Sequence, residues 1–415
     1  MFRADLENSP SRPPRVLLAV LLFVALTGRL AFVLSLPPDD LGRSLPDQRE
    51  YLDLGRSLLA GEGLRFIDLR FGTDVKAFRA PGYPLLVAGS GGGVRTIRLV
   101  QAILDTSTVL ATYLLARRWL AAGPGMLAAM LVALNPFLIF FCSLILSETL
   151  FTTLLVWSVA LLANSTDPRR RRPRAWFWAG AVLAALTIHV RPGAIGLPVV
   201  LGLATALAGG PAFSSGGRRL LSLPVGASML VLTILTLLPW ALRNRTVVNA
   251  WVWTSTNGGF TLYDGLNPDA TGGSDQSFVR RMPQLQTMGE VERSAYLSRE
   301  ALAWAGENPG RAALLAGRKL GRMWSPVPLS TEYGGRRMYV AAAAAYAIPL
   351  FALSLVGLRR RVLPRAAKGL LLAPAIYFSV AHAVTVGSMR YRVPVEPMLA
   401  VVAASAVVIR ARERS

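Results

Sequence analysis

The sequence has few of the residues on which a water-soluble enzyme depends. Only 16% of its 415 residues are charged and 53% are hydrophobic, whereas soluble domains carry about 25% charged residues. Its single cysteine, Cys142, excludes an intramolecular disulfide. Its only two histidines, His189 and His382, do not make a zinc site by themselves. The composition therefore argues against both a soluble globule and a zinc enzyme.

Long apolar blocks are what the sequence has instead. They run for about 17 to 22 residues, the length that spans the hydrocarbon layer of a bilayer. We therefore predict an all-α polytopic membrane protein with about ten transmembrane helices. The expected spans are 16–36, 96–116, 124–142, 147–164, 175–190, 193–209, 220–241, 338–357, 367–386 and 394–409.

The distribution of the net charge of +22 predicts the orientation. Segments on the N-terminal side of the membrane hold 20 Lys and Arg against 4 Asp and Glu, a net charge of +16. This positive-inside pattern places both termini in the cytoplasm and the loops 37–95 and 242–337 outside the inner (plasma) membrane. It also argues against nucleic acid as the partner of these basic residues.

The chain is expected to form one membrane domain with two short ends. Residues 1–15 are polar and proline-rich, which predicts a disordered cytoplasmic lead-in. Residues 16–409 form the transmembrane domain, whose first span stays uncleaved, and 410–415 form a cytoplasmic tail. In the second outside loop, Asn308 before Pro309 predicts a helix that runs to Trp324, is basic and apolar, and lies on the membrane surface.

Asp47 is the first candidate for chemistry. Asp47, Glu50 and Tyr51 share one face of a helix that Gly61 and Gly63 end, just outside the membrane. One interpretation is structural, because Asp at the N-cap with Glu three residues later forms a capping box. The other is catalytic.

Glu148 is the second candidate. It lies between two expected spans with almost no polar connection, and an acid so close to hydrocarbon is usually functional. The structural alternative is that Ser147 caps the helix and Glu148 follows it, since acids suit helix N-termini.

Arginines at the outer ends of the spans form the third group. Positive-inside statistics disfavour arginine there, and guanidinium groups offer forked donors for a phosphate. The alternative is snorkelling to lipid headgroups. We expect phosphate binding by Arg191, Arg243, Arg390 and Arg392. Arg29, Asp105 and Glu396 are instead expected to pair inside the bundle.

Four stretches in this order resemble the GT-C superfamily of membrane glycosyltransferases, in the branch of bacterial aminoarabinose transferases and protein O-mannosyltransferases. The first is Asp47 to Tyr51 and Leu58-Leu59-Ala60-Gly61-Glu62-Gly63, with Arg79-Ala80-Pro81-Gly82-Tyr83-Pro84-Leu85. The others are Ser147-Glu148-Thr149-Leu150, then Pro239-Trp240 and Arg243-Asn244 with Gly258-Gly259, and finally Arg390-Tyr391-Arg392-Val393-Pro394.

The resemblance implies a role for each stretch. Asp47 would be the catalytic base, supported by Glu50, Tyr51, Arg79 and Tyr83, and Glu148 the second acid. Asp47 and Glu148 would hold a divalent ion, Mg or Mn, where the enzyme uses one. The arginines would bind the phosphate of a polyprenyl-phosphate sugar donor.

This sequence departs from the family pattern in two places. Gln48 follows Asp47 where protein mannosyltransferases carry Asp-Glu. With about ten spans expected, we also expect no large C-terminal outside domain like that of the aminoarabinose transferases. The acceptor, whether glycan, lipid or protein, therefore does not transfer from the family.

The predicted function is inverting transfer of a sugar to an acceptor hydroxyl at the extracytoplasmic face, with Asp47 as general base. Two alternatives remain. A transporter or flippase of lipid-linked sugars would use the same arginines without needing Asp47, although transporters commonly show repeated halves that this sequence lacks. A non-enzymatic membrane scaffold predicts no coupling between Asp47 and any turnover.

Overall fold

The computed structural model describes residues 15–38, 41, 45–209, 222–329 and 334–408. The expected lead-in, apart from Arg15, and the expected tail 410–415 lie outside these residues. In the described part, six helices are long and apolar enough to cross a membrane. They are α1 (Arg15–Leu34), α4 (Val94–Ala116), α7 (Glu148–Ser165), α10 (Ser222–Val247), α16 (Arg337–Arg359) and α17 (Arg365–Val384). The chain is thus an all-α, multi-pass membrane protein, as predicted.

The remaining expected spans are also helical, and all except that at 175–190 are shorter or interrupted. They correspond to α5 (Ala122–Ala133) with α6 (Pro136–Phe141), α8 (Pro173–Val190), α9 (Leu197–Ala208) and α18 (Glu396–Ala404). The expected span 124–142 breaks at Asn135, whose side chain accepts hydrogen bonds from the backbone N–H groups of Phe137 and Leu138. The nine residues of α18 rise roughly 14 Å, about half the thickness of a hydrocarbon layer.

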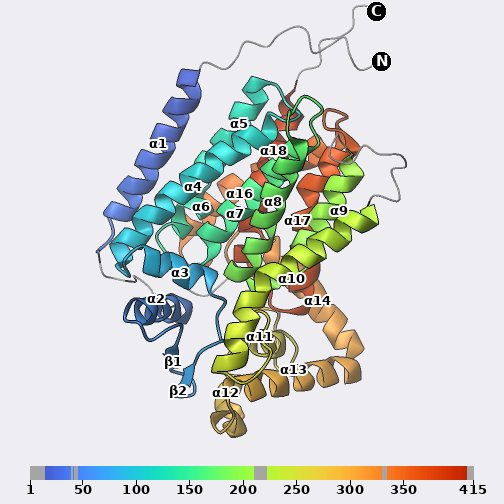
Figure 1. Ribbon diagram of the computed structural model, residues 1–415. Helices are drawn as coiled ribbons and strands as arrows, with labels where there is room; N and C mark the ends of the chain where they lie inside the picture. Colours follow the sequence, from blue (N-terminus) through green and yellow to red (C-terminus); the bar gives the residue numbers. More distant parts are fainter. Residues whose placement is uncertain (1–14, 39–40, 42–44, 210–221, 330–333, 409–415) are drawn as a thin grey trace, which may run out of the picture.

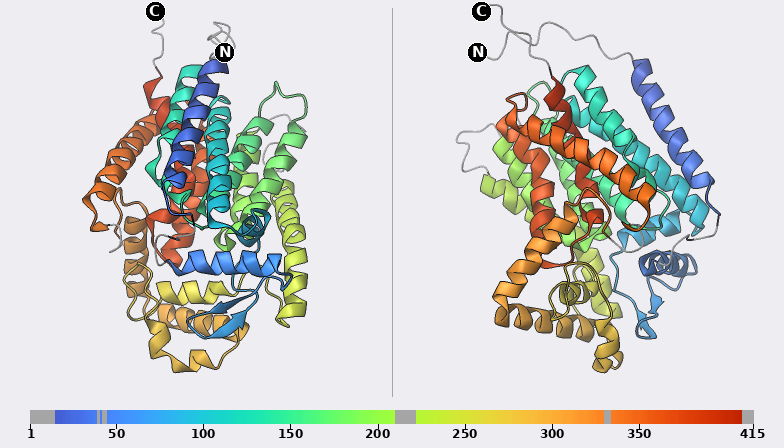
Figure 2. Two further views of the ribbon diagram at one scale, coloured as in Figure 1. Left: turned by 90° about the vertical axis from the view of Figure 1, so that its left-hand side faces the viewer. Right: turned by 180° about the vertical axis from the view of Figure 1, so that it is seen from behind.

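The two expected outside loops fold into a second layer at one end of the bundle (Figure 1). The first loop contains α2 (Pro46–Leu59), the antiparallel hairpin β1 (Phe66–Asp68) and β2 (Thr73–Val75), and α3 (Gly82–Gly89). The second contains α11 (Asn257–Gly265), α12 (Phe278–Arg281), α13 (Glu290–Glu307) and α14 (Pro309–Met323). Helix α1 begins at the opposite end, and the views in Figure 2 show the same separation. Both loops therefore share one side, as the topology predicted.

Two glycines allow close contacts that fix this layer. A Cβ on Gly82 would lie 2.7 Å from the carbonyl oxygen of His189, so the start of α3 rests directly on the end of α8. A Cβ on Gly259 would lie 1.9 Å from the carbonyl oxygen of Ser294, so α11 and α13 touch through their backbones. Any larger side chain would force these elements apart.

Helix α14 begins and ends close to the predicted residues, but its environment is more buried than expected. The Asn308 side chain does not cap it; the Asn308 amide instead donates to the Trp304 carbonyl at 2.9 Å. Leu315 and Lys319 are fully buried, and the Lys319 ammonium donates to the Val384 carbonyl at 2.8 Å. One side of this basic helix therefore packs on the end of α17.

Candidate active site

Glu148 begins α7 at the junction between the bundle and the outer layer. Its side chain is only 1% exposed, and its Oε1 atom lies 2.6 Å from both Arg191 Nη2 and Arg390 Nε. Ser147 makes no capping hydrogen bond to the helix, so the capping alternative does not account for these residues. Among the described residues, Glu148 Oε2 is buried without a hydrogen-bond partner. That oxygen is free to accept a hydrogen bond from a ligand.

Asp47 faces the same arginine from α2. The helix begins at Pro46 after Leu45 and has no side-chain cap, so the capping interpretation of Asp47 is wrong. Its carboxylate lies 2.6 Å from Arg79 Nη2 and 3.4 Å from Arg390 Nη2 instead. Arg390 therefore connects two acids that are about a hundred residues apart in the chain.

The first-loop residues predicted to support Asp47 surround Arg79. Arg79 Nε donates to Glu50 at 2.7 Å, and its guanidinium lies 5.2 Å from the centre of the Tyr51 ring. The Tyr51 and Tyr83 rings meet edge to face at 4.8 Å, and the Tyr83 hydroxyl donates to Gln101 at 2.8 Å. These contacts hold Arg79 in place from α2, α3 and α4.

The charges around Asp47 set its proton affinity. Burial would raise the pKa of Asp47, but the positive charges of Arg79 and Arg390 outweigh it and hold that pKa well below its usual value. Burial lowers the pKa of Arg390, but Glu148, Tyr391 and Asp47 raise it well above its usual value. Asp47 is therefore ionised, and it is a weak base while both arginines hold it.

Two of the four predicted phosphate-binding arginines lie elsewhere. Arg243 donates to the carbonyl oxygens of Leu64 and Lys76 at 2.9 and 2.6 Å, and thus supports the hairpin. Arg392 is fully buried and donates to Glu396 at 2.9 Å. The structure brings Arg191 and Arg390 to the acids and leaves Arg243 and Arg392 outside the cluster.

The pairs predicted inside the bundle are present. Arg29 Nε lies 2.5 Å from Asp105, with both side chains 1% exposed. Glu396 accepts from Asn135 at 2.7 Å as well as from Arg392. These residues stabilise helix packing rather than the site.

Three contributors to the site were not predicted. Arg70, in the turn of the hairpin, donates to Glu50 at 3.0 Å, although nothing in its sequence context indicates this. Gln48 is buried and accepts from the Ile145 N–H at 2.9 Å, which ties α2 to the segment before Glu148. Tyr391, beside Arg390 in the sequence, stacks on His382 with ring centres 3.7 Å apart. The position of Tyr391 between two predicted phosphate-binding arginines was the sequence signal that could have identified it as part of the site.

The cluster does not fit a divalent metal as it is arranged. In the described part of the chain, no group of three or more His, Cys, Asp or Glu side chains could hold an ion. Asp47 and Glu148, the expected ligands, are each bonded to two arginines. Guanidinium groups thus occupy three of the four carboxylate oxygens that a hard cation would need, and only Glu148 Oε2 is left.

Comparisons with known proteins agree with this architecture. Residues 85–243, less than half of the chain, match the family described as dolichyl-phosphate-mannose-protein mannosyltransferase. No curated protein matches the sequence.

Among solved structures, the archaeal oligosaccharyltransferase AglB from Archaeoglobus fulgidus, in complex with an inhibitory peptide and a dolichol-phosphate, superposes with a TM-score of 0.58 at 14% identity. The alignment covers 94% of this chain and 50% of AglB. A second structure of that oligosaccharyltransferase, with Zn and sulfate, gives a TM-score of 0.52 at 14% identity over 93% of this chain and 48% of that one. ArnT from Cupriavidus metallidurans, bound to undecaprenyl phosphate, superposes with a TM-score of 0.44 at 18% identity. That alignment covers 95% of this chain and 78% of ArnT.

These matches confirm the predicted resemblance to the GT-C superfamily and its polytopic helical fold. This chain spans about half the length of AglB.

Proposed function

We propose that this GT-C-like membrane protein is a glycosyltransferase that moves a sugar from a polyprenyl-phosphate donor to an acceptor hydroxyl. The observation that carries the proposal is the position of Arg390. Its guanidinium contacts Asp47 on α2 and Glu148 on α7, where the outer layer meets the apolar bundle. A donor with a lipid tail and a charged phosphate needs such a site, because the tail requires an apolar surface and the phosphate requires a cation beside it.

Arg191 and Arg390 are the proposed phosphate ligands. Their side chains are 14% and 29% exposed, and both point to the single oxygen Oε1 of Glu148. A phosphate can replace that oxygen as the hydrogen-bond acceptor, or accept from the same two guanidinium groups beside it, because charge-assisted bonds from arginine are strong and often bidentate. Glu148, the second acid, keeps the two guanidinium groups at the spacing that the phosphate requires.

The proposed chemistry is one displacement at the anomeric carbon. The acceptor oxygen attacks C1 as its proton passes to Asp47, and the bond from C1 to the phosphate oxygen breaks with its electron pair leaving on the phosphate. Arg191 and Arg390 stabilise the developing charge. One displacement inverts the configuration at C1.

Donor binding would also activate the base. A phosphate on Arg390 adds negative charge beside Asp47 and competes for the guanidinium that holds it at 3.4 Å. Both effects raise the affinity of Asp47 for a proton, since a like charge disfavours a carboxylate. Asp47 then becomes a better base when a donor is present.

The donor class is supported by the family description and by the dolichol-phosphate in the AglB complex. The location is supported by the charge asymmetry of the sequence, which puts the cluster on the extracytoplasmic side of the inner membrane. The single membrane domain 16–409, with the outer loops 37–95 and 242–337 forming the site, is part of the same proposal.

The test is to incubate the purified full chain with a panel of polyprenyl-phosphate sugars and an envelope extract as acceptor. We expect one donor to be consumed with transfer of its sugar, and Asp47→Asn to lose at least a hundredfold in transfer while it still binds that donor. Unchanged transfer in Asp47→Asn would reject Asp47 as the base. Movement of the lipid-linked sugar across vesicles without transfer would favour the flippase, and neither activity would favour the scaffold.

A further inference from the structure

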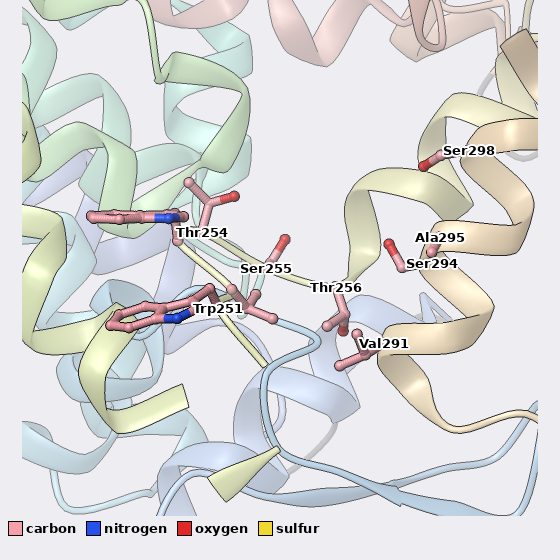
Figure 3. A pocket seen from close by; sticks show the side chains of 10 residues that line it. Trp251, Thr254, Ser255, Thr256, Val291, Ser294, Ala295 and Ser298 are labelled. Carbon is pink, nitrogen blue, oxygen red and sulfur yellow. The ribbon is translucent and has the colours of Figure 1, made fainter. Parts of the chain in front are cut away.

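A hollow of about 260 Å³ lies in the outer layer, apart from the carboxylate and arginine cluster. The segment 251–256, which follows α10, forms one wall, and α13 forms the other (Figure 3). Figure 3 shows Trp251 on one side and Ser294 and Ser298 across the gap. The hollow is open to the surroundings rather than enclosed by the bundle.

Two tryptophans with nearly parallel rings line one side of the hollow. The Trp251 and Trp253 rings are stacked with centres 6.2 Å apart and planes 20° apart. Trp251 is 57% exposed and Trp253 38% exposed, which is high for such large apolar side chains. An indole offers an apolar face together with an N–H donor, a combination that suits ligands with both apolar and polar faces.

The rest of the lining is polar but uncharged. All ten lining residues are neutral, and half of them carry a hydroxyl: Thr254, Ser255, Thr256, Ser294 and Ser298. The Thr256 hydroxyl already donates to Glu290. Each of the other four hydroxyls can donate one hydrogen bond and accept others, so together they suit a ligand rich in hydroxyl groups. A phosphate or lipid headgroup would require basic residues in the lining. The chemistry that fits is a neutral sugar, whose C–H face stacks on the rings.

The hollow is joined to the active site through the backbone before Arg79. The Thr256 N–H donates to the Ala77 carbonyl at 2.9 Å, and the Thr256 hydroxyl donates to Glu290 at 2.8 Å. Glu290 also accepts from the Lys76 N–H at 2.8 Å. Arg79, two residues after Ala77, holds Asp47. One rigid connection therefore links the wall of the hollow to the proposed base.

We propose that this hollow binds a neutral saccharide, the body of a glycan acceptor whose terminal hydroxyl reaches Asp47. The proposal rests on the glycosyltransferase function and names its acceptor class. It assigns Trp251 and Trp253 to acceptor recognition and leaves donor binding to the arginines.

The test uses the full chain in lipid nanodiscs on an array of neutral hexose, pentose and N-acetylhexosamine oligosaccharides. We expect the wild type to bind at least one class, and Trp251→Ala and Trp253→Ala to weaken that binding at least tenfold. Trp178→Ala is the matched control, because Trp178 is 45% exposed on α8 and does not line the hollow. It should bind as the wild type does. No binding by the wild type, or equal binding by all variants, overturns the proposal.

Asp47→Asn separates this inference from the proposed function. It should keep saccharide binding and lose transfer. If it loses transfer but the wild type binds no saccharide, only the acceptor site fails; if it transfers normally, the base assignment fails whatever the array shows.

A second measurement addresses a membrane-anchoring role for the two tryptophans. In nanodiscs of brominated phospholipid, we expect a Trp251→Phe, Trp253→Phe double variant to lose an equal or larger fraction of its fluorescence than the wild type, because the proposal places both rings outside the lipid. Clearly weaker quenching in the double variant would place the rings in lipid and overturn the proposal.

Discussion

Arg390 donates to Glu148 at 2.6 Å across 242 positions of sequence. The contact joins the turn between α17 and α18 to the first residue of α7, and both lie where the bundle meets the outer layer. Arg191 reaches the same carboxylate oxygen at 2.6 Å. Two cations thus converge on one buried acid, and the second oxygen of that acid remains without a partner among the described residues. In the proposed function, a donor phosphate accepts from these two guanidinium groups in place of Glu148 Oε1 or beside it.

Arg390→Ala should weaken donor binding. One charge-assisted hydrogen bond contributes about 1.5 to 3 kcal/mol, so the apparent constant for the donor should rise by roughly ten- to a hundredfold. The measurement is initial transfer rate against donor concentration. Arg311→Ala is the control, since Arg311 is an exposed arginine on α14. An unchanged donor constant in Arg390→Ala would remove this arginine from the phosphate site.

The pH dependence of kcat/KM should report how far Arg79 lowers the pKa of Asp47. A base must be unprotonated, and the pKa of Asp47 lies well below its usual value, so its acid limb should fall below about pH 4. Arg79→Gln removes the positive charge at 2.6 Å while burial remains. The pKa then rises by about 1 to 3 units, and kcat/KM should fall as the pH drops through that new value.

The control for the pH experiment is Arg65→Gln. Arg65 pairs with Asp74 at 2.9 Å on the hairpin, where its side chain is 43% exposed. Its removal should leave the acid limb unchanged. Equal profiles for Arg79→Gln and the wild type would show that Asp47 is not the group whose ionisation limits transfer.

The sequence predicted the elements of this fold better than their contacts. Apolar length located the helices, and the acids and arginines at span ends located Asp47, Glu148, Arg191 and Arg390. Arg392 was grouped with Arg390 because the two are neighbours in one motif. In the structure their side chains diverge, and Arg392 bonds Glu396 one helical turn later. Side-chain direction within a short 3-10 turn depends on tertiary packing, which spacing does not reveal.

The capping interpretation of Asp47 was wrong for a related reason. The sequence places an acid and a glutamate three residues apart, a pattern that local chemistry explains. Arg79 and Arg390, which compete for that acid, are 32 and 343 positions away. Only the fold shows that long-range ion pairs replace the local cap.

Cysteine labelling should establish the orientation of the outer layer. Cys142 is fully buried, so the wild type should give little background with a membrane-impermeant maleimide. Leu69→Cys, at a 72% exposed position in the hairpin turn, should react in intact spheroplasts. Arg171→Cys, an exposed position between α7 and α8, should react only after the membrane is opened. The reverse pattern would put the carboxylate and arginine cluster in the cytoplasm and contradict the proposed function.

Arg392→Met should reduce stability without changing donor affinity. Arg392 and Glu396 are both fully buried, and loss of the cation leaves an uncompensated buried carboxylate. Breaking such a pair costs about 3 to 5 kcal/mol, so the melting temperature should fall markedly. A double variant, Arg392→Met with Glu396→Gln, removes that charge and keeps an acceptor for the Asn135 amide that Glu396 bonds at 2.7 Å. It should recover part of the loss. If Arg392→Met instead keeps its melting temperature and raises the donor constant as Arg390→Ala does, Arg392 belongs to the phosphate site after all.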